Sequence, residues 1–302
     1  MNGCSLQIQS ILYHNNKDDL VRSMTSISRA IELNHGSTQE IGEVKLCYGD
    51  ASQEPLFTDS EISNLQERFG SILHIEYQFF NENTGTAKGH NILGENCSSQ
   101  YMLVMNPDVI VIPRLFTAMM HPFKTSELNV GLVEARQTPI EHPKEYNINT
   151  GETGWATTAC ALFPTNIFHI LNGFDADSFF LYCDDVDFSW RIRLLGKKII
   201  YRPSALVYHA KTLSANASWE PTSAEVYYSA EAALMMAYKW SNDSRLKKIL
   251  HIFTHSTDEN LINAALKFQD KASKCQLPER LDAKNKVAEF VGDYYTTHRY
   301  TL

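Results

Sequence analysis

The segment ILHIEYQFFNENTGTAKGHNILGENCSSQYMLVMNPDVIVI (72–112) has the pattern of a strand, a helix and a second strand. The runs at 72–80 and 101–112 are strongly apolar, and the glycine-containing stretch between them leads into a helix. This order favours a parallel sheet that is covered by helices. Ligands of such sheets bind at the carboxyl ends of the strands, so the polar residues found there are candidates for a functional site.

The same alternation extends toward the N-terminus. LQIQSILY (6–13) and EVKLCYGD (43–50) are predicted strands, and each is followed by a segment with apolar residues at helical spacing. The second of these helices, ISNLQERFG, ends at Gly70. We therefore expect the polar residues that follow the predicted strands to meet in one crevice; they are Tyr13 to Asn15, Asp50, Asn83 to Asn91, and Asn106 to Asp108.

A second group of polar residues lies in FFLYCDDVDFSW (179–190), where three aspartates interrupt large apolar and aromatic side chains. An unpaired buried charge is costly, so these acids need a specific role. Asp184 or Asp185 can cap the helix that is predicted to begin near Val186, and the dipole of that helix favours an ionised carboxylate. A sheltered, ionised carboxylate suits a general base, whereas Asp187 is expected to make structural contacts.

Two residues indicate a metal site. Asp108 could offer a hard oxygen ligand to Mg²⁺ or Mn²⁺ at a strand end, although Asn-Pro-Asp is also an ordinary turn sequence. His209 ends the predicted strand LVYH, where a neutral imidazole beside Asp108 would suit Mn²⁺; a structural histidine is the alternative. Gly85 and Gly89, at the start of a predicted helix, would allow a phosphate-bearing ligand to approach closely.

The composition limits the class of protein. A chain of 302 residues with 43% hydrophobic content suits one large α/β domain with appendages, and its net charge of −8 argues against a nucleic-acid-binding surface. Scattered cysteines, no signal-peptide pattern and no apolar run of about 20 residues favour a cytoplasmic location. Residues 245–302 carry 10 Lys+Arg against 7 Asp+Glu. This basic tail is either a solvated helical face or a surface that docks on a membrane or a partner.

Taken in order, these motifs resemble those of family 2 glycosyltransferases with the GT-A fold, especially the rhamnosyltransferase-like branch that builds bacterial surface polysaccharides. The most specific match is FFLYCDDVDFSWRIRLLGKKIIYRPSALVYH (179–209), with its aromatic run, acid pair, Val-Asp and later Val-Tyr-His. The resemblance implies a mostly parallel, Rossmann-like sheet flanked by helices over residues 1–215. The nucleotide would bind to about residues 1–112 and the acceptor to about 113–215, and residues 216–302 would form a helical C-terminal extension.

The resemblance also implies roles for single residues. Asp185 would be the catalytic base of an inverting transfer, and Asp184 and Trp155 would contact the acceptor. Asp108 and His209 would bind Mn²⁺ or Mg²⁺. The residues expected to contact the nucleotide-sugar are Tyr13, Asn15, Asp50, Asn83, Gly85, Lys88, Asn91 and Asn106.

The implied activity is transfer of L-rhamnose from dTDP-L-rhamnose to a hydroxyl of a glycan or lipid-linked acceptor, during synthesis of O-antigen, capsule or another surface polysaccharide. A UDP-sugar donor carrying galactose or N-acetylglucosamine is an alternative. The basic tail would then lie at the inner face of the plasma membrane. A non-catalytic scaffold that binds nucleotides or glycans is a rival of another class. A sugar-nucleotide pyrophosphorylase is disfavoured, because HNNKDD (14–19) is not its Gly-rich, basic loop.

Overall fold

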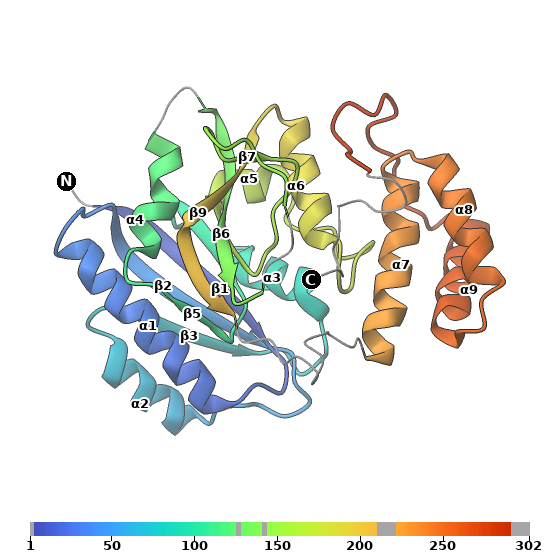
Figure 1. Ribbon diagram of the computed structural model, residues 1–302. Helices are drawn as coiled ribbons and strands as arrows, with labels where there is room; N and C mark the ends of the chain where they lie inside the picture. Colours follow the sequence, from blue (N-terminus) through green and yellow to red (C-terminus); the bar gives the residue numbers. More distant parts are fainter. Residues whose placement is uncertain (1–2, 125–127, 141–143, 210–221, 291–302) are drawn as a thin grey trace.

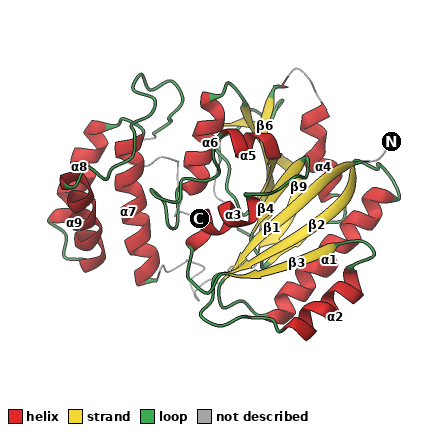
Figure 2. Ribbon diagram, turned by 180° about the vertical axis from the view of Figure 1, so that it is seen from behind, coloured by secondary structure: helices red, strands yellow, loops and turns green. Residues whose placement is uncertain are grey.

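The computed structural model describes residues 3–124, 128–140, 144–209 and 222–290, and the strands found there form one mixed sheet (Figures 1 and 2). The strand order is β3-β2-β1-β4-β8-β6-β9-β5, with β7 paired to β9 beside this path. The first four strands are parallel, β8 is antiparallel to β4 and β6, and β9 is parallel to β6. The strands are β1 Cys4–Leu12, β2 Ile41–Asp50, β3 His74–Phe79, β4 Tyr101–Met105, β5 Val109–Val111, β6 Val130–Thr138, β7 Glu152–Thr153, β8 Cys160–Pro164 and β9 Lys198–His209.

Helices cover both faces of the sheet, which confirms the expected helix-flanked α/β architecture. One face is covered by α1, α2 and α4, and the other by α3, α5 and α6, because each helix presents an apolar side to the strands. In α1 the residues predicted from their helical spacing are fully buried; they are Leu20, Met24, Ile27 and Ile31. The helices are α1 Lys17–His35, α2 Asp59–Phe69, α3 Gly85–Gly94, α4 Leu115–Met120, α5 Thr165–Ile170, α6 Asp184–Leu194, α7 Ser223–Lys239, α8 Asp243–Thr254, α9 Glu259–Ser273 and the short 3₁₀ helix His121–Lys124.

The segment 101–112 differs from the single interrupted strand that its apolar pattern predicts. It forms two strands, β4 next to β1 and β5 at the sheet edge beside β9, which run in opposite directions. Pro107 has no backbone N–H to donate to a ladder, so the chain turns here. The turn places Asn106 and Asp108 at the sheet edge where β1, β6 and β9 end.

The three C-terminal helices α7, α8 and α9 form a layer beside α6 (Figures 1 and 2). Trp190 of α6 meets Trp240 edge to face, with the ring centroids 5.1 Å apart. The fully buried Asp187 carboxylate accepts hydrogen bonds from Trp240 Nε1 at 3.0 Å, Lys239 Nζ at 2.6 Å and Arg191 Nε at 2.7 Å. Asp187 thus makes the structural contacts expected of it. The helical tail is shorter than predicted, because no helix follows α9 among the residues described up to 290.

Candidate active site

Asp108 and His209 lie together at the carboxyl edge of the sheet. β5 pairs with β9 so that Val109 is opposite His209, which brings the preceding Asp108 beside the histidine ring. His209 Nε2 lies 3.5 Å from Asp108 Oδ2 and 3.2 Å from Asn106 Nδ2. The Asp108 side chain is 33% exposed and that of His209 only 10%. The two expected metal ligands are therefore adjacent, and the carboxylate is the more open of the two.

The imidazole of His209 is held from behind by residues that the sequence analysis did not select. His209 Nδ1 lies 2.8 Å from Gln137 Oε1, and Gln137 Nε2 donates to Thr157 Oγ1 over 2.9 Å. Thr157 Oγ1 in turn donates to Glu134 Oε1 over 3.0 Å, and Lys144 Nζ contacts Glu134 Oε2. Burial raises the pKa of the Glu134 carboxyl, and the Lys144 ammonium opposes that rise. These side chains form a buried hydrogen-bond chain that ends at the histidine.

Asp184 and Asp185 open α6, directly after a strained turn. Tyr182 and Cys183 both have left-handed backbone, with φ of 68° and 61°, which is costly for residues other than glycine. Asp185 Oδ1 accepts a hydrogen bond from the next backbone N–H over 2.8 Å, and Thr86 Oγ1 of α3 donates to Asp184 Oδ2 over 3.3 Å. Only 5% of Asp184 and 8% of Asp185 is exposed. Both acids are thus sheltered at a helix N-terminus.

The turn that carries these acids, residues 179–183, is packed between α3 and α7. Tyr182 Oη donates to Glu225 Oε1 in the first turn of α7 over 2.9 Å, and the Phe180 and Tyr228 ring centroids lie 4.7 Å apart. On the other side, a Cβ at Gly85 would lie 2.3 Å from the Phe180 carbonyl oxygen. Gly85 also has φ of 65°, so this position suits glycine on both grounds. The C-terminal helices therefore contribute directly to the position of the acids.

Residues 155–159 connect the acid pair to the metal pair. The N–H of Ala156 donates to Ser189 Oγ of α6 over 3.0 Å. At the other end of the segment, the carbonyl of Ala159 accepts from the N–H of Asn106 over 3.0 Å. Thr157, which lies between them, is part of the buried hydrogen-bond chain that ends at His209. One short segment thus lies between α6, whose Ser189 also donates to the Asp185 carbonyl over 2.8 Å, and the turn that carries Asn106 and Asp108.

Asp50, expected to contact a nucleobase, instead turns into the protein. It is fully buried, and its carboxylate accepts from the N–H of Ser52 at 3.0 Å, the N–H of Leu56 at 2.7 Å and Tyr77 Oη at 2.5 Å. Burial alone would raise the pKa of Asp50, but these hydrogen bonds, led by that of Tyr77, outweigh it and lower the pKa. Asp50 therefore shapes the loop that follows β2, and its oxygens do not face the crevice.

Asn91 and Trp155 are also supports of the fold in this structure. The Asn91 amide donates to the carbonyl of Phe174 over 2.7 Å and accepts from its N–H over 2.8 Å, which ties α3 to the turn after α5. Trp155 is 7% exposed and packs in the core cluster around Trp190. Lys144 Nζ lies 4.1 Å from the centroid of the Trp155 ring. Little of the Trp155 side chain therefore remains to contact an acceptor, and both polar atoms of the partly buried Asn91 amide are bonded to Phe174.

The other residues expected at the nucleotide lie around the ends of β1 and β3. Tyr13 is exposed just beyond β1, and its N–H donates to Asn15 Oδ1 over 2.8 Å. Asn83 Oδ1 accepts from the N–H of Gly85 over 3.2 Å, which opens α3. Lys88 pairs with a neighbouring glutamate at 2.7 Å, and half of its side chain is exposed. These groups are at least partly accessible, in contrast to the fully buried Asp50.

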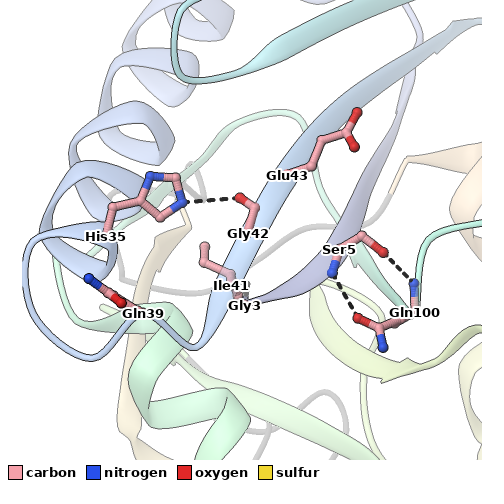
Figure 3. A pocket seen from close by; sticks show the side chains of 8 residues that line it. All are labelled: Gly3, Ser5, His35, Gln39, Ile41, Gly42, Glu43 and Gln100. Atoms are coloured by element: carbon pink, nitrogen blue, oxygen red, sulfur yellow. Dashed lines mark hydrogen bonds between the residues drawn. The ribbon is translucent and has the colours of Figure 1, made fainter. Parts of the chain in front are cut away.

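A separate hollow of about 540 Å³ lies at the opposite edge of the sheet, near the starts of β1 and β2 (Figure 3). It contains no residue that the sequence analysis selected. Its polar groups already bond to one another: His35 Nε2 lies 3.0 Å from the Gly42 carbonyl, and Ser5 and Gln100 bond twice, over 3.1 and 2.9 Å. The hollow lies far along the strands from the crevice, so the carboxyl edge remains the candidate active site.

No protein-family model and no curated protein sequence matches this chain. Its fold is similar to that of the mannosyltransferase PcManGT from Pyrobaculum calidifontis, solved with GDP-Man and Mn²⁺, with a TM-score of 0.54 and 14% identity over 90% of this chain and 76% of that one. It is also similar to GalNAc-T7 solved with UDP, GalNAc and Mn²⁺, with a TM-score of 0.61 and 9% identity over 92% of this chain but only 59% of that one. At these identities the likeness establishes the fold, which is of the GT-A glycosyltransferase type.

Proposed function

We propose that this protein is a metal-dependent glycosyltransferase, which moves a sugar from a nucleotide-sugar to an acceptor hydroxyl. The observation that supports the proposal most is that Asp108 and His209 are adjacent at the carboxyl edge of a GT-A fold, while residues 155–159 bond both to that turn and to α6, which begins with Asp184 and Asp185. Solved proteins of similar fold were captured with GDP-Man or UDP and with Mn²⁺. A cation for the diphosphate and a base for the acceptor are the two parts that this chemistry needs.

The donor atoms of the metal pair fit Mn²⁺. A carboxylate oxygen of Asp108 and Nε2 of His209 form a mixed set, which suits Mn²⁺ better than Mg²⁺, a cation that prefers oxygen ligands alone. Among the described residues, no group of three or more His, Cys, Asp or Glu side chains could hold a metal. Diphosphate oxygens and water would therefore complete the coordination. When bound, the ion would stabilise the negative charge that develops on the leaving diphosphate.

Asp185 is the proposed base. It lies at the N-terminus of α6, where the helix dipole favours the ionised form, and it is nearly buried. It would take the proton of the acceptor hydroxyl while the acceptor oxygen bonds to the anomeric carbon and the bond from that carbon to the diphosphate breaks. A single displacement of this kind inverts the configuration. Asp184, oriented by Thr86, would accept a hydrogen bond from the acceptor.

For the donor we propose dTDP-L-rhamnose, and for the acceptor a glycan or lipid-linked sugar of a cell-surface polysaccharide. The motif resemblance over 179–209 supports this choice, and UDP-galactose or UDP-N-acetylglucosamine is the alternative. Tyr13, Asn15, Asn83 and Lys88 are the proposed accessible contacts to the nucleotide. The C-terminal helices are the proposed contact with the inner face of a membrane, and α8 is the basic one, with one Arg and two Lys against one Asp. In the described parts of the chain, no helix is long and apolar enough to cross one.

A ligand panel tests the donor. The protein is heated with dTDP, UDP, GDP or CDP and with their sugars, each with and without Mn²⁺. A ligand at a hundredfold excess over its dissociation constant stabilises by about 2.7 kcal/mol, which raises the midpoint of a 302-residue protein by about 4 °C. We expect one nucleotide to give a shift that requires Mn²⁺. A panel without any Mn²⁺-dependent shift would contradict the proposal.

The stereochemistry and the base are tested with the donor found in the panel. NMR of the product should show the opposite anomeric configuration to that of the donor. Asp185→Asn should lower kcat by about 10²–10⁴-fold with little change in donor binding, because general-base catalysis contributes a factor of that size. Asp177→Asn, at an exposed aspartate in the segment that precedes the acid pair, is the control. If the product kept the anomeric configuration of the donor, or if Asp185→Asn were fully active, Asp185 would not be the catalytic base.

A non-catalytic scaffold that binds nucleotides or glycans is the second candidate. Two observations favour it: an amide, that of Asn106, stands next to His209 where a further carboxylate would strengthen a metal site, and Asp50 is withdrawn from the crevice. Under this alternative, nucleotides would bind without Mn²⁺ dependence and no donor would be consumed. The ligand panel and a product assay therefore separate the two candidates.

A further inference from the structure

We propose that Gln137, Thr157 and Glu134 are positioning residues, which hold His209 in the tautomer with hydrogen on Nδ1 so that the Nε2 lone pair faces the metal site. The proposal rests on the proposed function, because it concerns the same site. It can nevertheless be tested without a sugar, a nucleotide or an acceptor, since a tautomer is a property of the free protein.

Glu134 gives the hydrogen-bond chain its direction. Burial disfavours its charge, but its Oε2 contacts the almost fully buried ammonium of Lys144, and the side-chain and backbone donors of Thr157 also favour the carboxylate form. A carboxylate only accepts hydrogen bonds. Thr157 Oγ1, 3.0 Å from Glu134 Oε1, must therefore be the donor in that contact.

The direction then passes to the histidine. Because Thr157 has used its one hydroxyl hydrogen, its Oγ1 can only accept from Gln137, so the NH₂ of Gln137 faces Thr157 at 2.9 Å. The carbonyl Oε1 of Gln137 is then the atom 2.8 Å from His209 Nδ1, and a carbonyl only accepts. Nδ1 must carry the hydrogen. In the neutral ring Nε2 then keeps its lone pair, which is the state that a metal-binding imidazole requires.

The surroundings of this chain favour a single arrangement. Gln137, Thr157 and Glu134 are all buried, so water is not available to satisfy a reversed amide. On the open side, Asn106 Nδ2 lies 3.2 Å from Nε2, which is the geometry of a donor facing an acceptor nitrogen. A buried partner on the far nitrogen and polar groups on the near one together orient the ring toward Asp108.

The first readout is the tautomer itself. In the metal-free protein at a pH where His209 is neutral, ¹⁵N chemical shifts of its ring distinguish Nδ1–H from Nε2–H. We expect Nδ1–H in the unaltered protein. Thr157→Val, which keeps the shape and removes the hydroxyl, should give a mixture, because Gln137 can then turn either amide atom to the ring. An Nε2–H histidine in the unaltered protein would overturn the proposal.

The second readout is the affinity for Mn²⁺ alone, followed by water-proton relaxation. Gln137→Leu should weaken binding by about 10–100-fold, as is typical when a partner behind a metal ligand is lost. Gln7→Leu is the matched control, because Gln7 is also a buried glutamine of the sheet, but its amide donates to the Leu93 carbonyl of α3 instead of facing His209. Unfolding midpoints of both variants separate a loss of structure from a loss of affinity. An unchanged Mn²⁺ affinity of folded Gln137→Leu would also refute the proposal.

The outcomes distinguish this inference from the proposed function. If the unaltered protein has Nδ1–H and Gln137→Leu weakens Mn²⁺ binding, but no nucleotide-sugar is consumed, the transferase proposal fails and the positioning role stands. If sugar transfer occurs but His209 carries its hydrogen on Nε2, the transferase proposal stands and the positioning role fails. If Gln137→Leu does not fold, the positioning role is still tested by the His209 tautomer of Thr157→Val, which should be a mixture.

Discussion

The substitution Asp187→Asn tests whether α7 is held to α6 by a buried charge cluster. It preserves the volume of the side chain but replaces a carboxylate with an amide, whose NH₂ would face the cations Lys239 and Arg191. At an effective dielectric constant of about 20, charges 2.6 Å apart, as for Lys239 and Asp187, attract by about 6 kcal/mol before desolvation is subtracted. The net effect of removing one partner of a buried pair is about 3–5 kcal/mol.

The lower end of that range applies here, because neither cation loses all its partners. Lys239 keeps Asp175 at 2.6 Å, and Arg191 keeps the carbonyls of Leu171 and Gly173, both at 2.9 Å. We therefore expect a loss of about 3 kcal/mol. With an unfolding entropy of about 2.1 cal/mol/K per residue, this lowers the midpoint of the 302-residue chain by about 5 °C.

The assay is urea denaturation followed by tryptophan fluorescence, which reports on Trp190 and Trp240 at this contact. Asp177→Asn, an exposed aspartate nearby, should change stability by less than about 0.5 kcal/mol. Breaking a buried ion pair costs about 3 kcal/mol or more. If the free energy of unfolding of Asp187→Asn were within about 1 kcal/mol of that of the unaltered protein, the reasoning would be refuted.

Three further changes test other parts of the structure. Asn106→Asp adds a carboxylate beside His209 and should tighten Mn²⁺ binding by about tenfold, by the oxygen preference of this cation; the exposed Asn263→Asp is the control, and an unchanged affinity would place position 106 outside the reach of the ion. Gly85→Ala should destabilise by about 2 kcal/mol in urea, since the position has φ of 65° and lies against a carbonyl of the acid-bearing turn; stability equal to that of the parent would show that the turn relaxes. Burial would raise the pKa of Asp175, but the charge and hydrogen bond of Lys239 outweigh it and lower the pKa. The contribution of this pair is therefore present above the ordinary value of 3.8 and lost as the pH falls below it, and Asp175→Asn should flatten this acid limb of a midpoint-against-pH curve.

The alternation of strands and helices could be predicted because it depends on local periodicity. The prediction that Asp108 and His209 lie together is confirmed for a different reason, because β5 pairs antiparallel with β9 and places Val109, the residue after Asp108, opposite His209. The acids at 184 and 185 were predictable as a helix start. In each case, position along an element decided the location of the side chain.

The direction of single side chains in loops was not predictable from local pattern. Asp50 and Asn91 stand where crevice residues were expected, but each turns to a partner distant in sequence, Tyr77 and Phe174 respectively. The buried chain behind His209 was missed for a related reason, because its members come from separate segments. One signal was visible in VGLVEARQT (130–138): the glutamate inside an apolar run implied a buried partner.

The contacts of the acid-bearing turn with α7, Tyr182–Glu225 and Phe180–Tyr228, have a consequence during synthesis of the chain. Chains emerge from the ribosome N-terminus first, so every residue proposed for the site leaves before α7 does. A nascent chain that has just passed His209 contains all of these side chains, but it lacks the Glu225 that bonds Tyr182 and the Trp240 that packs on Trp190. Under the proposed function, activity should therefore arise only after translation has passed Trp240, and incomplete translation products should not consume the nucleotide-sugar.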